Sequence, residues 1–126
     1  MFAFAIWDNR KKKLFLARDK LGEKPLFYAN DNNNGIIFGS TFSSLSSHPE
    51  IQNSSKINFK SLNQYFKFNY LLFENTFFEN IKLLKPANYL EINQENKSLK
   101  IQQKQYWNLS NIIVEKKNYK LEEAKE

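Results

Sequence analysis

The sequence contains no cysteine, and it has only three glycines, three prolines and one histidine. Without cysteine the chain can form no disulfide, no thiolate metal site and no cysteine nucleophile. The one histidine, His48, has no second histidine with which to hold a metal ion, so we expect no metal site. No stretch matches the GxGxxG or P-loop patterns, and we expect no phosphate-cradling loop.

Long hydrophobic runs are also missing. No stretch approaches the roughly 18–20 apolar residues that a membrane-spanning helix needs. The apolar N-terminal run is too short for a signal peptide and lacks a basic lead-in. The sequence therefore predicts a cytoplasmic protein with no membrane contact.

The formal charge is +6, from 19 basic and 13 acidic residues. The basic residues are spread along the chain, and the one dense run, Arg10 to Lys13, falls where we expect a turn. Runs of this size are usually solvated loops, so we predict no nucleic-acid partner. The alternative, nucleic-acid binding through this turn, would show an affinity that falls steeply with salt.

The stretch LFLARDKLGEKPLFY, which begins at Leu14, is the feature around which the rest of the chain is arranged. A strand-like run ends in the charged pair Arg18-Asp19, and Gly22 and Pro25 bracket a tight turn before a second strand. Glycine permits backbone angles that other residues resist, and proline fixes the angle at which the next strand leaves. Taken alone, this pattern is an ordinary surface hairpin with a charged tip.

Apolar periodicity predicts the remaining elements. Asn58 can cap a helix through about Phe68, and a short helical or turn segment is expected over 41–47. The first four strands should form one antiparallel meander. The strands are expected at 2–7, 13–18, 25–29, 35–39, 88–92 and 98–106.

The strand at 2–7 is apolar on both faces, so both faces should be covered. The sequence offers about one amphipathic helix for that purpose, with Phe59, Leu62, Tyr65 and Phe66 as its packing stripe. About half of the covering layers would then be missing. We therefore interpret the chain as truncated at both ends.

Several motifs occur in a characteristic order. They are FAFAIWD at 2–8, LFLARDKLGEKPLFY at 14–28, FGS at 38–40, LSSHP at 45–49, TFFENI at 76–81, LKPANYL at 84–90 and YW at 106–107. In this order they resemble the glutamine amidotransferase domain of glutamine-hydrolysing asparagine synthetases, more exactly its second half. The resemblance covers residues 1 to about 108, the first two motifs being specific and the later ones looser. Residues 109–126 would form a linker or the start of a missing synthetase domain.

The resemblance implies an α+β fold: a partial N-terminal-nucleophile (αββα) glutaminase fold of antiparallel sheets with few covering helices. In that family a cysteine at the chain start attacks the glutamine amide, and the released ammonia amidates aspartate that ATP has activated. Those residues precede or follow the matched motifs, and position 1 here is Met1. The resemblance therefore implies no catalytic, cofactor or metal residue in this chain, and no activity for it alone.

The resemblance implies that ATP and Mg, together with glutamine and aspartate, are bound by the parent enzyme. It also implies a synthetase domain in cis, and a homodimer of the parent is one expected assembly. Four residues are carried over as structural or domain-interface residues: Arg18, Asp19, Gly22 and Pro25. A structural role for Arg18 and Asp19 is favoured, and the alternative is that they line the ammonia route. The alternatives for the whole chain are a relative that amidates another acceptor and a non-catalytic binding module.

The chain departs from the family pattern at three places. Thr41 replaces a usual glutamate, Ala87-Asn88 replaces Gly-His, and Leu72 and Glu74 replace two prolines. These departures leave the acceptor substrate open.

Overall fold

The computed structural model describes residues 1–31, 34–72, 74–95 and 98–114, which form seven strands and four helices. An α+β fold class with antiparallel sheets and few helices is thereby confirmed. The strands are β1 (Ala3–Asp8), β2 (Lys13–Arg18), β3 (Phe27–Asn30), β4 (Ile36–Gly39), β5 (Ile81–Leu83), β6 (Asn88–Glu95) and β7 (Ser98–Gln105). The helices are α1 (Phe42–Ser46), α2 (Pro49–Ser54), α3 (Phe59–Phe68) and α4 (Leu109–Val114).

The strands divide into two sheets. Sheet A has the order β1-β2-β6-β7, and sheet B has the order β4-β3-β5. The chain leaves sheet A after β2, forms all of sheet B and returns to sheet A with β6. The predicted four-strand meander is therefore wrong, because β2 pairs with β6 and β3 pairs with β5 instead of with each other.

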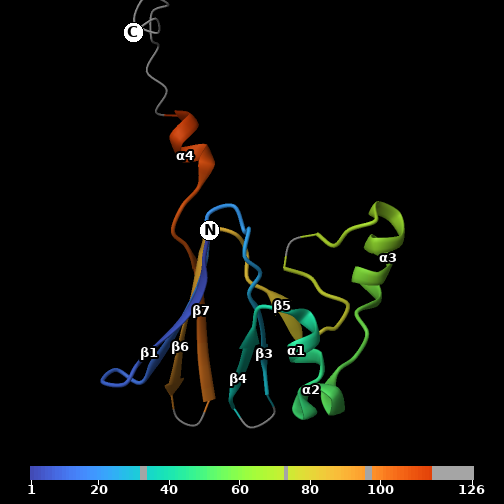
Figure 1. Ribbon diagram of the computed structural model, residues 1–126, viewed down its shortest axis with the longest axis horizontal. Helices are drawn as coiled ribbons and strands as arrows, with labels where there is room; N and C mark the ends of the chain where they lie inside the picture. The colour runs from blue at the N-terminus through green and yellow to red at the C-terminus, as the bar shows by residue number, and fades with distance from the viewer. Residues whose placement is uncertain (32–33, 73, 96–97, 115–126) are drawn as a thin grey trace, which may run out of the picture.

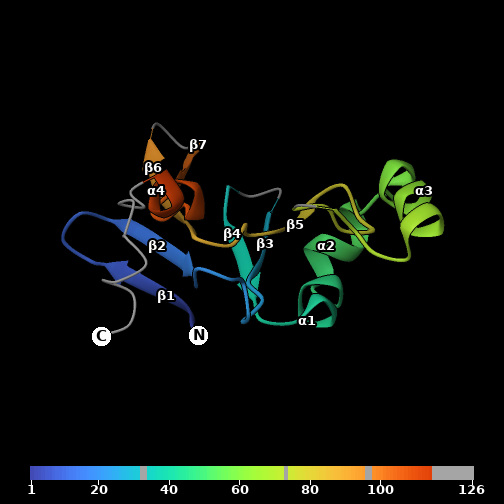
Figure 2. The same ribbon diagram turned by 90° about the horizontal axis from the view of Figure 1, so that it is seen from above.

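The two sheets and the first three helices form successive layers, seen side by side in Figures 1 and 2. One core lies between the sheets and includes Leu16, Leu90 and Ile92 from sheet A with Leu26 and Tyr28 from the sheet B side. A second core lies beneath the helices, where α1 and α2 cover the outer face of sheet B. Its members are Ala29, Leu45, Ile51 and Ile81.

The outer face of sheet A carries a row of aromatic rings. None of the described helices lies over that face (Figure 1). The ring centroid of Phe4 lies 5.4 Å from that of Phe2 and 6.1 Å from that of Phe15, and the centroids of Phe15 and Tyr89 are 4.9 Å apart. The prediction that β1 is covered on both faces is wrong: Phe4, Ile6 and Trp7 are exposed. Among the described strands, β1 pairs with β2 alone and so forms an edge of sheet A.

Helix α3 begins where the sequence predicts. The Asn58 side chain accepts a hydrogen bond from the Ser61 amide (3.1 Å), and the helix ends at Asn69 in a left-handed conformation. Its predicted packing stripe is largely wrong, since Phe59 and Phe66 are each 74% exposed. The buried residue of the helix is Ser61, on the opposite face.

After β7 the chain continues into α4, in the segment where the sequence predicts a linker or the start of a helix. The remainder of that predicted segment, 115–126, lies outside the described residues. Among the described helices, none combines the length and apolar character needed to cross a membrane.

Candidate functional site

Arg18 is the last residue of β2, and its guanidinium is buried between the two connections that join the sheets. Its Nε donates to the Lys24 carbonyl (2.9 Å) and its Nη2 to the Gly22 carbonyl (2.6 Å). Its Nη1 donates to the Leu84 carbonyl (2.5 Å). The first two acceptors lie on the connection from β2 to β3, and the third lies on the connection from β5 to β6. One side chain therefore ties both connections together.

Asp19 completes this cluster from the other side of the backbone. Its carboxylate accepts hydrogen bonds from the backbone amides of Lys24 (3.0 Å), Glu23 (3.0 Å), Leu21 (3.1 Å) and Phe2 (3.3 Å). The amide of Lys24 contributes most to holding the pKa of Asp19 well below its usual range, although burial opposes that shift. The ionised carboxylate thus organises the turn and anchors the start of the chain.

The main chain at Asp19 joins further segments to what we call the Arg18–Asp19 cluster. The Asp19 carbonyl accepts from the amides of Gly22 (3.2 Å) and Ala87 (2.9 Å). The Tyr106 hydroxyl donates to the Arg18 carbonyl (2.8 Å), and the Tyr106 amide donates to the Ala87 carbonyl (2.9 Å). Four segments therefore meet at the end of β2: the start of the chain, the turn after β2, the connection from β5 to β6, and the segment that follows β7.

Gly22 is required by its surroundings. Its φ is +72°, and a Cβ there would lie 2.8 Å from Pro86 Cγ and 3.0 Å from the Arg18 guanidinium. A side chain would therefore push into the group that ties the connections. Pro25, by contrast, is exposed and ends the turn immediately before the buried Leu26.

Ala87 provides a prediction about stability, because it holds a left-handed conformation (φ 57°) at the position where the family pattern has glycine. We expect Ala87→Gly to raise the free energy of unfolding by roughly 0.5–1 kcal/mol, since relief of the left-handed strain exceeds the entropy cost of glycine. Urea unfolding followed by circular dichroism measures the change. Ala29→Gly is the matched control: Ala29 is equally buried but lies in β3 without positive φ, and there glycine should destabilise. A lower unfolding free energy for Ala87→Gly would contradict the prediction.

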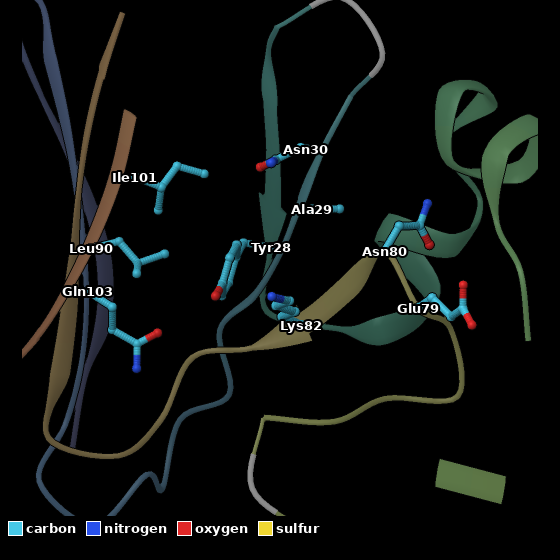
Figure 3. A pocket seen from close by; sticks show the side chains of 9 residues that line it. All are labelled: Tyr28, Ala29, Asn30, Glu79, Asn80, Lys82, Leu90, Ile101 and Gln103. Carbon is cyan, nitrogen blue, oxygen red and sulfur yellow. The ribbon is translucent and has the colours of Figure 1, made fainter. Parts of the chain in front are cut away.

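A cleft of about 430 Å³ opens between the two sheets, and no residue of the Arg18–Asp19 cluster lines it (Figure 3). Tyr28 from β3 faces Leu90, Ile101 and Gln103 from sheet A across this space, and Lys82 stands beside Tyr28 on β5. Burial raises the pKa of Tyr28, and the charge of Glu74 raises it further. The lining therefore combines apolar Leu90 and Ile101 with neutral hydrogen-bonding groups, one cation and one carboxylate.

The cleft does not contain a catalytic set. Its lining includes one carboxylate, Glu79, which Figure 3 shows on the far side of β5 from Tyr28. Acid–base catalysis by a pair of carboxylates would need a second one within reach of the same atom. Across the part of the chain that the structure describes, no three acidic or histidine side chains gather closely enough to hold a metal ion.

Of the residues selected from sequence, Arg18, Asp19 and Gly22 lie together and Pro25 lies at the edge of their turn. Their assignment to a domain interface stays a prediction. Sequence reasoning missed Leu84 as a partner, because a backbone carbonyl acceptor leaves no mark on residue type. It missed Tyr106 because the hydroxyl of that residue donates to the backbone carbonyl of Arg18. The motifs LKPANYL and YW were the signal that these segments belong with the turn.

Comparison with known proteins identifies the chain more closely. A family model described as a glutamine amidotransferase domain matches residues 1–107. Glutamine-hydrolysing asparagine synthetase 2 of Bacillus subtilis is 37% identical over 119 residues, which cover 90% of this chain and 15% of that protein. Glutamine-hydrolysing asparagine synthetase 3 of the same organism is 32% identical over 110 residues, covering 86% of this chain and 17% of that protein.

A putative glutamine-hydrolysing asparagine synthetase 2 of Methanocaldococcus jannaschii is 34% identical over 82 residues, 61% of this chain and 16% of that protein. The chain thus spans less than a fifth of the length of these relatives. The resemblance noted in the sequence motifs is confirmed. The chain belongs to the glutamine amidotransferase domain family.

Proposed function

We propose that this chain is a scaffold portion of the glutamine amidotransferase domain of a glutamine-dependent asparagine synthetase. Residues 1–108 would form the second half of that domain, and 109–126 would lead into a synthetase domain in cis. The observation that carries the proposal is the family match over residues 1–107 together with a fold tied at the Arg18–Asp19 cluster. The parent enzyme would act in the cytoplasm, and a homodimer is its candidate assembly.

The layer arrangement supports an incomplete αββα architecture. Helices cover the outer face of sheet B, whereas the aromatic outer face of sheet A has no cover among the described residues. A sheet with two apolar faces is stable only when both are packed against another layer. We infer that the rest of the amidotransferase domain supplies a helical layer over sheet A.

The chemistry would lie outside this portion. Hydrolysis of the glutamine amide by this family needs a thiolate nucleophile, and the 126 residues contain no cysteine. The chain alone should therefore be inactive, and ATP, Mg and aspartate would be bound by the synthetase domain of the parent. Within this chain, residues such as Arg18 would act only by holding the sheets in register.

The departures from the family pattern do not favour another acceptor substrate. Thr41 accepts a hydrogen bond from the Ser44 amide (3.3 Å) and so caps α1. The Asn88 side chain bonds the Pro86 carbonyl (2.8 Å) and Gln103 (3.1 Å). Both residues have local structural roles and carry no information on the acceptor; we propose aspartate because the relatives are named asparagine synthetases.

A chimera tests the scaffold proposal. Residues 1–107 would replace the matching region of Bacillus subtilis glutamine-hydrolysing asparagine synthetase 2, and asparagine formation would be measured with glutamine and, separately, with ammonia. We expect glutamine-driven synthesis to persist in the chimera. Retention of ammonia-driven synthesis with complete loss of glutamine-driven synthesis, in a chimera whose amidotransferase region is folded, would overturn the proposal. Release of glutamate from glutamine by the 126-residue chain alone would overturn the proposed inactivity.

A further inference from the structure

The turn between β3 and β4 contains the single Asn-Gly pair of the sequence, Asn34-Gly35. This pair is typical of tight hairpin turns because both residues tolerate a positive φ, and the φ of Asn34 is 57°. Asn34 is exposed to solvent. Glycine has no Cβ to keep its own amide nitrogen away from the preceding side chain. The turn therefore presents an asparagine amide next to an unhindered backbone nitrogen.

Such a pair can react within itself, with water as the one co-reactant. The Gly35 nitrogen loses its proton and bonds to Cγ of Asn34, while the Cγ–Nδ2 bond breaks and that nitrogen leaves as ammonia. The product is a cyclic succinimide, which water then opens. Cleavage of the bond from the Gly35 nitrogen to Cγ gives aspartate, and cleavage of its bond to the main-chain carbonyl carbon gives isoaspartate. The net change replaces a neutral amide with a carboxylate.

The Asp31 carboxylate holds the attacking nitrogen. The Gly35 amide donates to Asp31 Oδ1, and the Asp31 amide donates to the Gly35 carbonyl (3.0 Å). A Cβ on Gly35 would lie 2.2 Å from Asp31 Oδ2, so the carboxylate is packed directly against this peptide unit. A carboxylate is too weak a base to remove an amide proton, and its charge disfavours the amide anion that must form. Asp31 should therefore restrain the reaction.

We propose that Asn34 is a self-catalysed deamidation site and that the Asp31 carboxylate slows its reaction. The chain supplies both the electrophile, Cγ of Asn34, and the nucleophile, the nitrogen of Gly35. The hydrogen bond from that nitrogen to Asp31 must open before the nitrogen can attack, so local opening of the turn sets the rate.

The products would change the hairpin in different ways. Aspartate at position 34 adds a charge and leaves the main chain as it was. Isoaspartate also routes the main chain through a side-chain methylene, which would displace the bond from the Asp31 amide to the Gly35 carbonyl that closes the turn. Asn34 and Gly35 line, with Trp7 and Lys12, a cavity of about 170 Å³ between the hairpin tip and sheet A. A longer turn would therefore alter the contact between the sheets at this end.

Asn69 provides a control within the same molecule. It is exposed and has a left-handed φ of 60°, as Asn34 has, but the residue after it is Tyr70. Its rate reports the effect of exposure and left-handed geometry without a following glycine. We expect Asn34 to deamidate faster than Asn69 by roughly tenfold or more, which is about 1.4 kcal/mol of activation free energy.

Mass spectrometry measures both rates. The 126-residue chain is incubated at neutral pH in heavy-oxygen water and digested with pepsin at acidic pH. Each deamidated residue then carries a solvent oxygen, and electron-transfer fragmentation separates aspartate from isoaspartate. The rate at Asn34 should rise steeply from pH 6 to pH 8, because the attacking amide must lose its proton. A rate at Asn34 that is no faster than at Asn69, or that does not change with pH, would overturn the proposal.

Variants test the role of Asp31. Asp31→Ala should speed deamidation of Asn34 severalfold and leave Asn69 unchanged. Asp8→Ala is the matched control, since Asp8 also accepts backbone amides in a hairpin turn, and it should leave Asn34 unchanged. Gly35→Ala should slow the reaction even though its Cβ displaces the Asp31 carboxylate. Equal acceleration of both asparagines by Asp31→Ala, or acceleration of Asn34 by Asp8→Ala as well, would refute the role given to Asp31.

The chimera that carries residues 1–107 tests the turn in the presence of the rest of an amidotransferase domain. Asn34 should again deamidate well before Asn69. Loss of that difference in a folded chimera would show that the rest of the domain protects the turn, and would overturn the proposal for the parent protein. These readouts measure mass and not asparagine formation, so they are independent of the proposed function.

Discussion

Replacing Arg18 with leucine should lower the free energy of unfolding by on the order of 3 kcal/mol, because three charge-assisted hydrogen bonds are lost and their acceptors stay behind. The carbonyls of Gly22, Lys24 and Leu84 would then face a side chain that cannot donate. The two connections between the sheets would lose their common tie. Urea unfolding followed by circular dichroism measures the loss.

Two companion variants make this prediction specific. Arg18→Lys should recover little of the stability, since an ammonium on a flexible stem cannot reach three carbonyls arranged around a planar guanidinium. Arg10→Leu removes an arginine from an exposed turn and should change stability by less than about 0.5 kcal/mol. If Arg18→Leu unfolded at the same urea concentration as the unchanged chain, the cluster would not hold the fold together.

Asp19→Asn should produce the second large effect, and it should depend on pH. The folded state holds the pKa of Asp19 below its usual range, so the ionised carboxylate favours folding. That contribution is fully present above the ordinary aspartate pKa of about 4 and is lost as pH falls through the lower, folded-state pKa. The unfolded chain binds the proton first, so acidification should pull the equilibrium toward unfolding.

Asparagine cannot ionise, so we expect Asp19→Asn to be less stable than the unchanged chain at pH 7. Below pH 5, unfolding of the variant should bind fewer protons than unfolding of the unchanged chain, by up to about one proton per molecule. Unfolding midpoints measured in urea from pH 7 down to pH 3 give both quantities. Glu23→Gln, in the same turn but with an exposed side chain, is the matched control. An acid limb with the same slope in Asp19→Asn as in the unchanged chain would rule out Asp19 as its source.

The local elements could be predicted from sequence, because their signals are local. Asn58 predicts a helix start because its side-chain oxygen can cap the first turn. The alternation of apolar and polar residues in 88–92 and 98–106 predicts two strands. β5, with three residues, is too short for a periodic signal. The family resemblance implied antiparallel sheets in an αββα arrangement, but periodicity could not assign the strands to them, since adjacent strands in the chain resemble a meander equally well whether or not they pair.

The site could be predicted in part. The Arg-Asp-x-x-Gly pattern marks a turn in which an ionised side chain and a left-handed glycine work together, and the structure brings Arg18, Asp19 and Gly22 into contact. The partners of Arg18 are backbone carbonyls, which every residue type carries. The packing role given to Phe59 and Phe66 was wrong because periodicity identifies an apolar face without showing whether anything covers it.

The order in which the chain leaves and re-enters sheet A has a consequence for how the protein folds. Leu16 pairs with Leu90, 74 positions later, and joining such distant points directly would cost roughly 4 kcal/mol of chain entropy. The β3–β4 hairpin and the addition of β5 to it shorten that loop in stages, so we expect sheet B to form before sheet A closes around its ends. Until then the two hairpins of sheet A would expose unpaired edges on β2 and β6. During synthesis, the interval between emergence of β2 and emergence of β6 would therefore be the period of greatest exposure to chaperones and to misassociation.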